Sequence, residues 1–141
     1  GGLVALTPAA GSTDILGAFA IGIITTIICF IMVAVIKPKF TYDDALDAFG
    51  VHGMGGIIGS ILTGVFATRC ITGEGGAEGA LYGNWHQLWV QTVATLVSIA
   101  FSAVVTYILY VLVDKTIGMR VCRRVEEEGL DIYEHGESAY N

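Results

Sequence analysis

Residues 41–66, TYDDALDAFGVHGMGGIIGSILTGVF, decide how the rest of this sequence is interpreted. No side chain from residue 48 to residue 68 carries a formal charge, and about 20 such residues are enough for a helix to cross a bilayer. On a helical wheel, one side of the segment is small or polar and carries a single imidazole. That side consists of Thr41, Ala45, Ala48, His52, Gly56, Gly59, Thr63 and Phe66. Such a face suits a helix that lines a narrow passage or packs very closely on another helix.

The composition points to a membrane protein. The chain has 141 residues, of which 54% are hydrophobic and 14% charged, whereas a soluble domain has about 25% charged residues. Its mean hydropathy is +0.70. The net charge of −6 comes mainly from residues outside the apolar runs, and nothing is basic enough to predict a nucleic-acid partner. The predicted fold class is all-α, a polytopic helical bundle in contact with membrane lipid.

Three complete membrane spans are predicted, at about residues 15–36, 42–68 and 85–113. Residues 1–11 are interpreted as the end of a further membrane helix, so the chain is expected to be the C-terminal portion of a longer protein. Pro38 is expected to stop the first span. Thr41 is expected to cap the second, with Asp44 as its capping-box partner. Residues 114–141 are predicted to form a polar tail outside the membrane.

The basic residues predict the orientation. Lys37 and Lys39 lie in one loop, and four more basic residues follow the last span, whereas Arg69 stands alone in the loop between the second and third spans. The positive-inside rule therefore places residues 37–43 and the C-terminal tail in the cytoplasm, and residues 69–84 outside. The expected location is the cell membrane. Cys29, Cys70 and Cys122 would then lie at three different levels, so no disulfide framework is predicted.

His52 is the leading candidate for a functional residue. An ionisable group within a membrane span is costly and marks a function by default. If the second helix begins near Tyr42, His52 lies roughly 15 Å along it, close to the bilayer midplane. The alternative is a neutral imidazole hydrogen-bonded to a neighbouring helix. Asp47, one turn earlier, could attract a cation, but a carboxylate bonded to the backbone or to loop residues is the favoured interpretation.

The glycines of this span also allow two interpretations. Gly56, Ser60 and Gly64 form a small-xxx-small series, for which close helix packing is the favoured explanation. His86 and His135 are far from His52 in sequence, and no metal-ligand spacing or nucleotide-binding motif is present. The sequence therefore predicts no catalytic site, no bound metal and no cofactor, and the protein is not expected to be an enzyme.

Three motifs, in order, resemble the Amt/Mep/Rh ammonium transporter family. Residues 47–56, DAFGVHGMGG, resemble the family's DxFxxHGxxG segment, and Gly59, Thr63 and Gly64 follow it. Residues 2–11, GLVALTPAAG, are similar to an AGLVxxTPAxG stretch. The C-terminal residues 128–131, 135–137 and 139–140 resemble the family's tail. Together these matches cover essentially the whole chain.

The resemblance implies an eleven-span helical fold, a homotrimer with one pore per subunit, and transport of ammonium as deprotonated ammonia. It implies that His52 is one of two paired pore histidines. Ala48 and Gly56, which share its face of the helical wheel, are predicted to line the pore beside it, with Asp47, Phe49 and Gly55 as supporting residues. It also implies a tail that contacts the cytoplasmic face and, in prokaryotes, docks a PII-type regulatory protein. The tail residues concerned are Gly129, Leu130, Asp131, His135, Gly136 and Tyr140.

Two other functions remain open from the sequence. The first is an ammonium sensor of the same fold that signals through its cytoplasmic tail. The second is a structural helical bundle in which His52 is only a buried polar link. Ammonium-driven current through the reconstituted full-length protein would separate transport from both.

Overall fold

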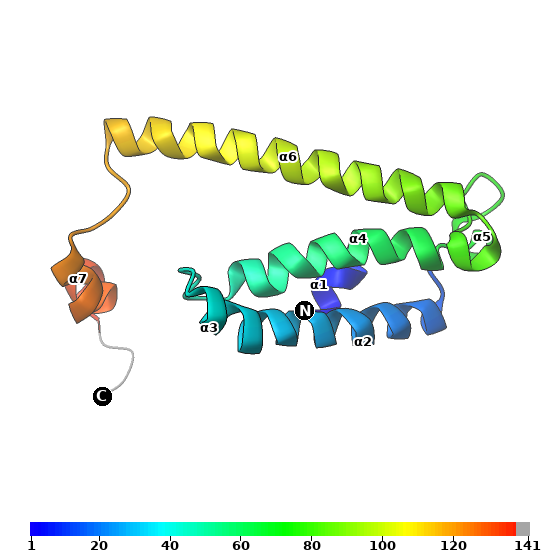
Figure 1. Ribbon diagram of the computed structural model, residues 1–141, viewed down its shortest axis with the longest axis horizontal. Helices are drawn as coiled ribbons and strands as arrows, with labels where there is room; N and C mark the ends of the chain where they lie inside the picture. The colour runs from blue at the N-terminus through cyan, green and yellow to red at the C-terminus, as the bar shows by residue number, and fades with distance from the viewer. Residues whose placement is uncertain (138–141) are drawn as a thin grey trace. The chain divides into compact units, whose positions relative to one another are not determined.

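The computed structural model describes residues 1–137, and every named element among them is a helix, in agreement with the predicted class (Figure 1). It divides into two compact units, Gly1–Ile99 and the residues from Ala100 onward. Among the described residues, three helices are long and apolar enough to cross a membrane: Ile15–Phe40, Phe49–Phe66 and Trp85–Thr116. These match the three predicted spans in order and approximate position, and the largest differences are at the end of the first and the beginning of the second.

The first span is longer than predicted. It runs without interruption through α2 (Ile15–Ile31), the π-helix η1 (Met32–Ile36) and α3 (Lys37–Phe40). Asp14 caps its start, where the carboxylate accepts a hydrogen bond from the amide of Gly17 at 2.8 Å. The expectation that Pro38 ends the helix is wrong, because the helix continues for two residues beyond it, to Phe40. The helix ends instead at Thr41, which is left-handed with φ 48°.

The second span begins later than predicted. Residues 41–47 form turns and irregular loop, and the helix starts with the π-helix η2 (Phe49–Gly53), followed by α4 (Met54–Phe66). Thr41 therefore does not cap this helix. Asp44 does, since its carboxylate accepts hydrogen bonds from the amides of Ala48 at 2.8 Å, Phe49 at 3.0 Å and Gly50 at 3.3 Å. Aspartate side chains compete for backbone donors in this way, which favours a loop over a helix around residues 43–47.

A short helix, α1 (Gly2–Leu6), packs against both α2 and α4, which lie side by side (Figure 1). The core consists of Ala5, Ala9 and Ile21, all fully or almost fully buried. At one end of the pair, an isolated antiparallel bridge joins Thr13 to Ala67, and the amide of Thr68 donates to the carbonyl of Ser12 at 2.8 Å. The chain ends that enter α2 and leave α4 are thereby tied together, as antiparallel helices require.

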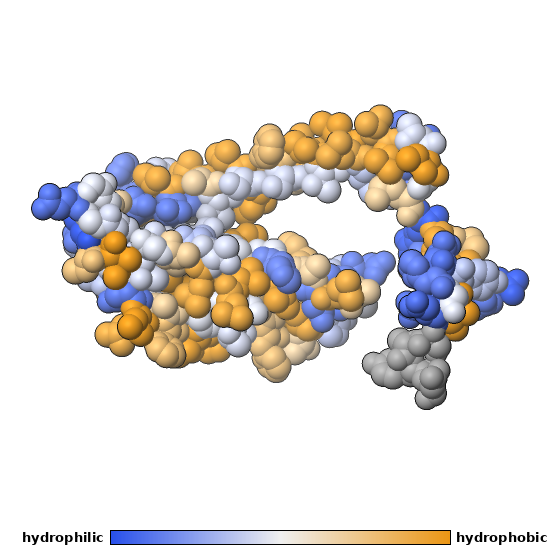
Figure 2. Space-filling model, turned by 180° about the vertical axis from the view of Figure 1, so that it is seen from behind, coloured by the Kyte–Doolittle hydropathy of each residue, from blue (hydrophilic) through white to orange (hydrophobic). Residues whose placement is uncertain are grey.

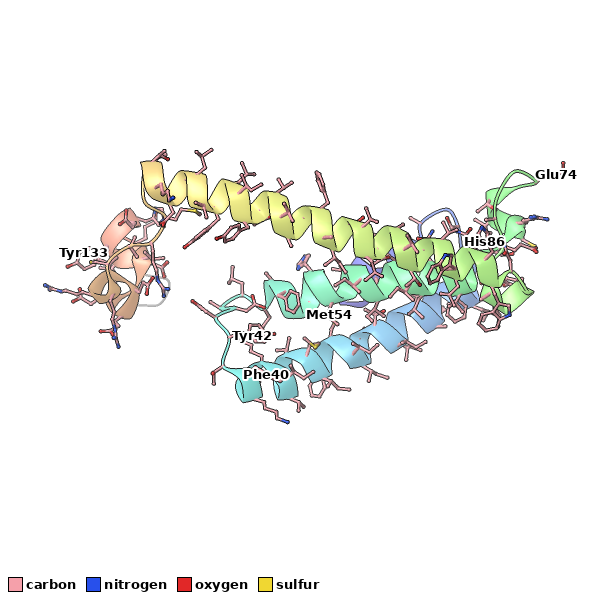
Figure 3. The ribbon with its side chains drawn as sticks, turned by 45° about the horizontal axis from the view of Figure 1, so that its top comes forward. Phe40, Tyr42, Met54, Glu74, His86 and Tyr133 are labelled. Carbon is pink, nitrogen blue, oxygen red and sulfur yellow. The ribbon has the colours of Figure 1, made fainter. Side chains whose placement is uncertain are left out.

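The predicted loop of residues 69–84 contains two short helices, α5 (Arg69–Thr72) and η3 (Ala80–Tyr82). The long helix α6 (Trp85–Thr116) follows and extends across the division between the two units. Gly64 of α4 faces its first part, because a Cβ at Gly64 would lie 3.0 Å from Leu88 and from Gln91. Figure 3 marks His86 near the start of α6 and Glu74 in the preceding loop.

After α6, the described chain contains α7 (Arg123–Glu128) and the π-helix η4 (Asp131–His135). Three arginine–glutamate pairs stabilise this region: Arg120–Glu126, Arg123–Glu127 and Arg124–Glu128. The pair at Arg120 is bidentate, with N···O distances of 2.6 and 3.0 Å. Hydrophilic side chains accordingly dominate the surface over α7, whereas hydrophobic side chains cover much of the surface of the helices (Figure 2).

Candidate functional site

His52 lies in the π-helical turn η2 at the beginning of the second span, and its side chain is exposed. The expected depth of roughly 15 Å along the helix is wrong, because that estimate started the helix at Tyr42. With η2 starting at Phe49, His52 lies only about 5 Å along the helix axis from its beginning. The imidazole is therefore held by the entrance turn of the helix and not by its middle.

Ala48 is exposed like His52, and a Cβ added at Gly56 would meet no atom within 4 Å. These three residues leave open space beside the helix. Gly59 and Thr63, which the wheel placed on the same face, are instead buried. A Cβ at Gly59 would come within 2.4 Å of the carbonyl oxygen of Ala5 in α1. The predicted small and polar face is thus divided between an open part near His52 and a part covered by α1.

The close helix packing also differs in register from the prediction. Gly55 and Gly59 contact α1, the first against Val4 and the second against Ala5. Of the predicted small-xxx-small series, Gly64 packs closely on α6, but Gly56 does not pack on any described residue. The glycine that packs on α1 is therefore Gly55, one residue before the predicted Gly56, because α1 contacts the helix on the side of Gly55.

Phe49 lies one turn before His52 and is about half exposed. Its ring meets the ring of Tyr42 edge to face, with centroids 6.1 Å apart and an interplanar angle of 88°. Figure 3 shows Tyr42 in the loop that leads from Phe40 toward this helix. A Cβ at Gly53 would lie 2.9 Å from the Phe49 ring, so the glycine makes room for that ring.

Asp47 forms an ion pair with Lys37, in which the lysine Nζ lies 2.5 Å from a carboxylate oxygen. The same Nζ donates to the backbone carbonyl of Asp44 at 2.6 Å. Asp47 has a left-handed backbone, with φ 54°, a conformation that aspartate tolerates better than most residues. Its carboxylate is bonded to a lysine in the last turns of the first span, whereas the favoured interpretation had the backbone or a loop residue as its partner.

A second contact joins the same turn to the preceding span. Cys29 of α2 donates through its thiol to the carbonyl of Val51, with an S···O distance of 3.7 Å. A Cβ at Gly50 would lie 2.8 Å from a methyl group of Val33 in η1. The π-helical turn η2, which carries His52, therefore packs directly against the π-helical turn η1 of the first span.

The sequence analysis missed this arrangement. A lysine and three aspartates flanking a loop of a few residues were visible, and their opposite charges could have suggested the Lys37–Asp47 pair. The π-helical turns have no comparable signal in the residue pattern. A π-helical turn is a single wider turn within a helix, so the periodicity of the residues does not reveal it.

The predicted tail residues lie in a separate unit. Gly129 and Gly136 both have positive φ angles, 100° and 66°, a backbone conformation that residues with a Cβ rarely adopt. Leu130, Asp131 and His135 are exposed. Tyr140 lies outside the described residues.

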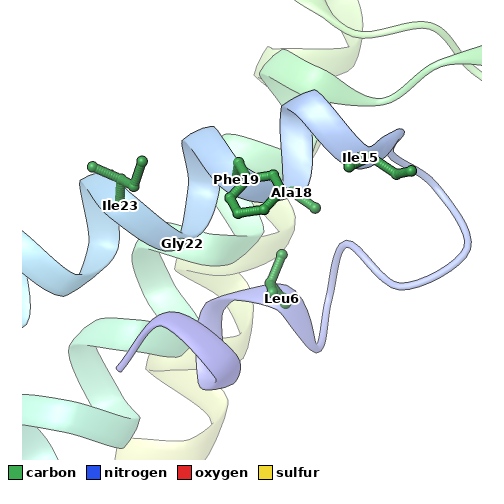
Figure 4. Close-up of a pocket in the computed structure, with 6 residues that line it drawn as sticks. All are labelled: Leu6, Ile15, Ala18, Phe19, Gly22 and Ile23. Atoms are coloured by element: carbon green, nitrogen blue, oxygen red, sulfur yellow. The ribbon is translucent and has the colours of Figure 1, made fainter.

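An apolar groove of about 320 Å³ lies between α1 and α2 (Figure 4). Its lining residues are Leu6, Ile15, Ala18, Phe19, Gly22 and Ile23. None of the residues predicted to line a pore belongs to it. Within residues 1–137, no three histidine, cysteine or acidic side chains are grouped closely enough to hold a metal ion.

The open face around His52 is chemically simple. A neutral imidazole offers one hydrogen-bond donor and one acceptor, and here its neighbours along the helix are the small residues Ala48 and Gly56. Such a face can accept a hydrogen bond from a small polar molecule, and its backbone leaves room for that molecule to approach.

Comparison with known proteins places this geometry in context. The family model described as the Ammonium Transporter Family matches residues 1–140. The chain is 46% identical over 140 residues to an ammonium transporter of Aquifex aeolicus, covering 99% of this chain and 32% of the relative. It is 45% identical over 139 residues to an ammonium transporter of Bacillus subtilis, covering 99% and 34%. The chain thus spans about a third of the length of these relatives, which are named as transporters and not as enzymes.

A solved structure is also similar. The crystal structure of Saccharomyces cerevisiae Mep2 superimposes with a TM-score of 0.77 and 32% sequence identity. The match covers 87% of this chain and 29% of the Mep2 chain. Both the sequence and the fold therefore agree with the resemblance seen in the three motifs.

Proposed function

Because this chain belongs to the ammonium transporter family, we propose that it takes part in ammonium transport across a membrane and that His52, Ala48 and Gly56 line the conduction path. The observation that carries this proposal is an exposed imidazole beside small residues on a helix of membrane-spanning length and composition. An imidazole whose neighbours on an apolar helix are small residues leaves room beside it for a small molecule.

The chemistry of the substrate explains why a histidine would be needed. An ammonium ion carries a charge that an apolar path disfavours strongly if it is unpaired. Loss of a proton gives neutral ammonia, which can cross such a path while bonded to the imidazole. The imidazole can accept the hydrogen bond and relay a proton that travels separately. Potassium has no proton to lose, so the same path rejects it.

A closed conduction path needs further helices around the open face that carries His52. We propose that they lie beyond the matched third of the relatives' length and include a second histidine that pairs with His52 through its other ring nitrogen. A homotrimer with one path per subunit completes this proposal. The tail would lie on the cytoplasmic face, where a PII-type protein is the proposed regulatory partner.

The test replaces His52 in the full-length protein and measures ammonium-driven current in proteoliposomes. His52→Leu should lower the current about a hundredfold, since a branched alkyl group can neither accept nor pass a proton. His52→Ala should instead widen the path and weaken discrimination between ammonium and potassium. His86→Leu, a change at the exposed histidine of α6, is the matched control and should conduct normally. Normal current and selectivity in His52→Leu would show that His52 is only a packing element.

The proposed orientation is tested with the two exposed cysteines, Cys70 and Cys122. A membrane-impermeant thiol reagent added outside intact cells should label Cys70 and spare Cys122, because the positive-inside rule places the first outside and the second inside. Permeabilised cells should be labelled at both. Labelling of Cys122 in intact cells would contradict a cytoplasmic C-terminus in the cell membrane.

A further inference from the structure

We propose that Lys37 is a positioning residue for His52. Its side-chain amino group ties the loop of residues 41–47 to the end of the first span, and that loop fixes the π-helical turn that carries the imidazole. This inference rests on the proposed function of His52. It adds a residue that itself need not touch the substrate.

Lys37 binds two points of the loop at the same time. Its Nζ donates at once to a carboxylate oxygen of Asp47 at 2.5 Å and to the backbone carbonyl of Asp44 at 2.6 Å. These acceptors lie three residues apart in one loop. Side-chain exposure is only 27% for Lys37 and 34% for Asp47, so the pair is partly shielded from water. A charged donor that holds two points of a loop restricts its shape more than either bond alone.

Hydrogen bonds connect the loop to the first turn of the helix. Asp44, held by Lys37 through its backbone carbonyl, uses its carboxylate to cap the amides of Ala48, Phe49 and Gly50. Asp47, held by Lys37 through its carboxylate, accepts the amide of Val51 with its backbone carbonyl at 2.8 Å. Both paths from Lys37 therefore end in the first turn of the helix, which contains His52.

Without the Lys37 amino group, the turn would keep only the contacts on its other side. Asp47 keeps a left-handed backbone that is uncommon for residues other than glycine. The opposite side of the turn is anchored independently, because Cys29 bonds to the carbonyl of Val51 and Val33 packs on Gly50. Loss of the Lys37 contacts would free one side of the turn while the other stayed fixed. The turn would then rotate, and the imidazole with it, without unfolding of the helix.

The experiment uses the full-length protein in nanodiscs and proteoliposomes, with Lys37→Met as the main variant. Methionine keeps a long flexible side chain and removes the donor. Lys39→Met, a change at the exposed lysine two residues later in α3, is the matched control. Asp47→Asn removes the charge from the other partner, and asparagine also tolerates the left-handed backbone. Lys37→Arg keeps a cationic donor, so its amide exchange and its current ratio should change less than those of Lys37→Met.

Two readouts are needed. The first is hydrogen exchange of the amides of residues 48–52, which should become about tenfold faster in Lys37→Met and Asp47→Asn and stay unchanged in Lys39→Met. The second is the ratio of ammonium to potassium current per assembled protein, which should fall in the same two variants. A purely structural ion pair would lower the amount of assembled protein and leave this ratio unchanged. In a His52→Ala background, Lys37→Met should cause no further change in the ratio.

The outcomes separate this inference from the proposed function. If the unmodified protein carries no ammonium current, the proposed function fails, and exchange alone decides whether Lys37 holds the turn. Unchanged exchange in both variants overturns the inference whatever the current. Faster exchange with an unchanged current ratio also overturns it, because the turn then moves without consequence for His52. If Lys37→Met does not assemble, Asp47→Asn carries the test.

Discussion

The region around α1 and the region after α6 are both helical, but different forces hold them. Around α1, α2 and α4, small residues let backbones approach closely, and Ala5 and Ile21 are fully buried. From residue 117 to residue 137, after α6, no described residue is buried. There the short helix α7 relies on arginine–glutamate pairs within its own neighbourhood, two of them with i,i+4 spacing.

The difference shows how each region should respond to change. Contacts between distant segments fix the first region, so a single added methyl group can disturb three helices at once. Local turns and exposed ion pairs fix the second, so a change there should leave the stability of the first region unchanged. Exposed ion pairs are individually weak and depend on salt and pH. The following predictions test this contrast in order of decreasing effect.

The largest effect is expected for Gly59→Ala. The new Cβ would lie 2.4 Å from the carbonyl oxygen of Ala5 and 2.6 Å from its Cα, so α1 must move away from α4. Because backbone atoms cannot yield as a side-chain end can, the change should destabilise the packed region by about 1–3 kcal/mol or more. Thermal unfolding of the full-length protein in detergent measures this loss.

Gly56→Ala is the matched control, one turn earlier on the same helix. A Cβ there meets no described atom within 4 Å, so the melting temperature should stay close to that of the parent. Equal melting temperatures for the two variants would contradict the role of close packing on α1.

A smaller effect is expected for Gly129→Val. The site is spatially open, so the cost comes only from φ 100°, a conformation that a β-branched residue avoids. The substitution should destabilise the turn after α7 by about 1–2 kcal/mol, and transport should fall. The melting temperature of the membrane region should not change. Gly75→Ala, at an equally open glycine without a positive φ, controls for the added side chain. A fall in the melting temperature as large as that of Gly59→Ala would abolish the contrast between the regions.

The smallest effect concerns Glu126. Its bidentate bond to Arg120 lowers the pKa of the Glu126 carboxyl below the ordinary value of 4.5. A lowered pKa means that the pair stabilises the folded tail above pH 4.5, and that this stabilisation is lost as the pH falls through the lowered value. Hydrogen-exchange protection of residues 123–128 should therefore decrease only below pH 4.5 in the parent. In Glu126→Gln it should already be lower at neutral pH, and identical profiles for the two proteins would show that the pair contributes nothing.

The sequence by itself determined the class of the protein and much of its layout. Apolar runs of sufficient length predict three spans, because a bilayer leaves a helix as the simplest way to satisfy backbone hydrogen bonds. The cap at Asp14 and the positive φ angles at Gly129 and Gly136 are local features of the same kind, since each depends only on residues close in the chain. The motif around His52 identified the family before any contact was known.

Only the tertiary structure decided where the second span begins and which side of it stays open. Residues 41–47 could continue the helical pattern, but Asp44 caps the turn that follows them and Lys37 binds the loop. Periodicity placed His52 and Gly59 on one face, yet α1 covers Gly59 and leaves His52 exposed. A residue pattern records which side chains share a face. It does not record which distant segment approaches that face, because that depends on contacts between parts of the chain far apart in sequence.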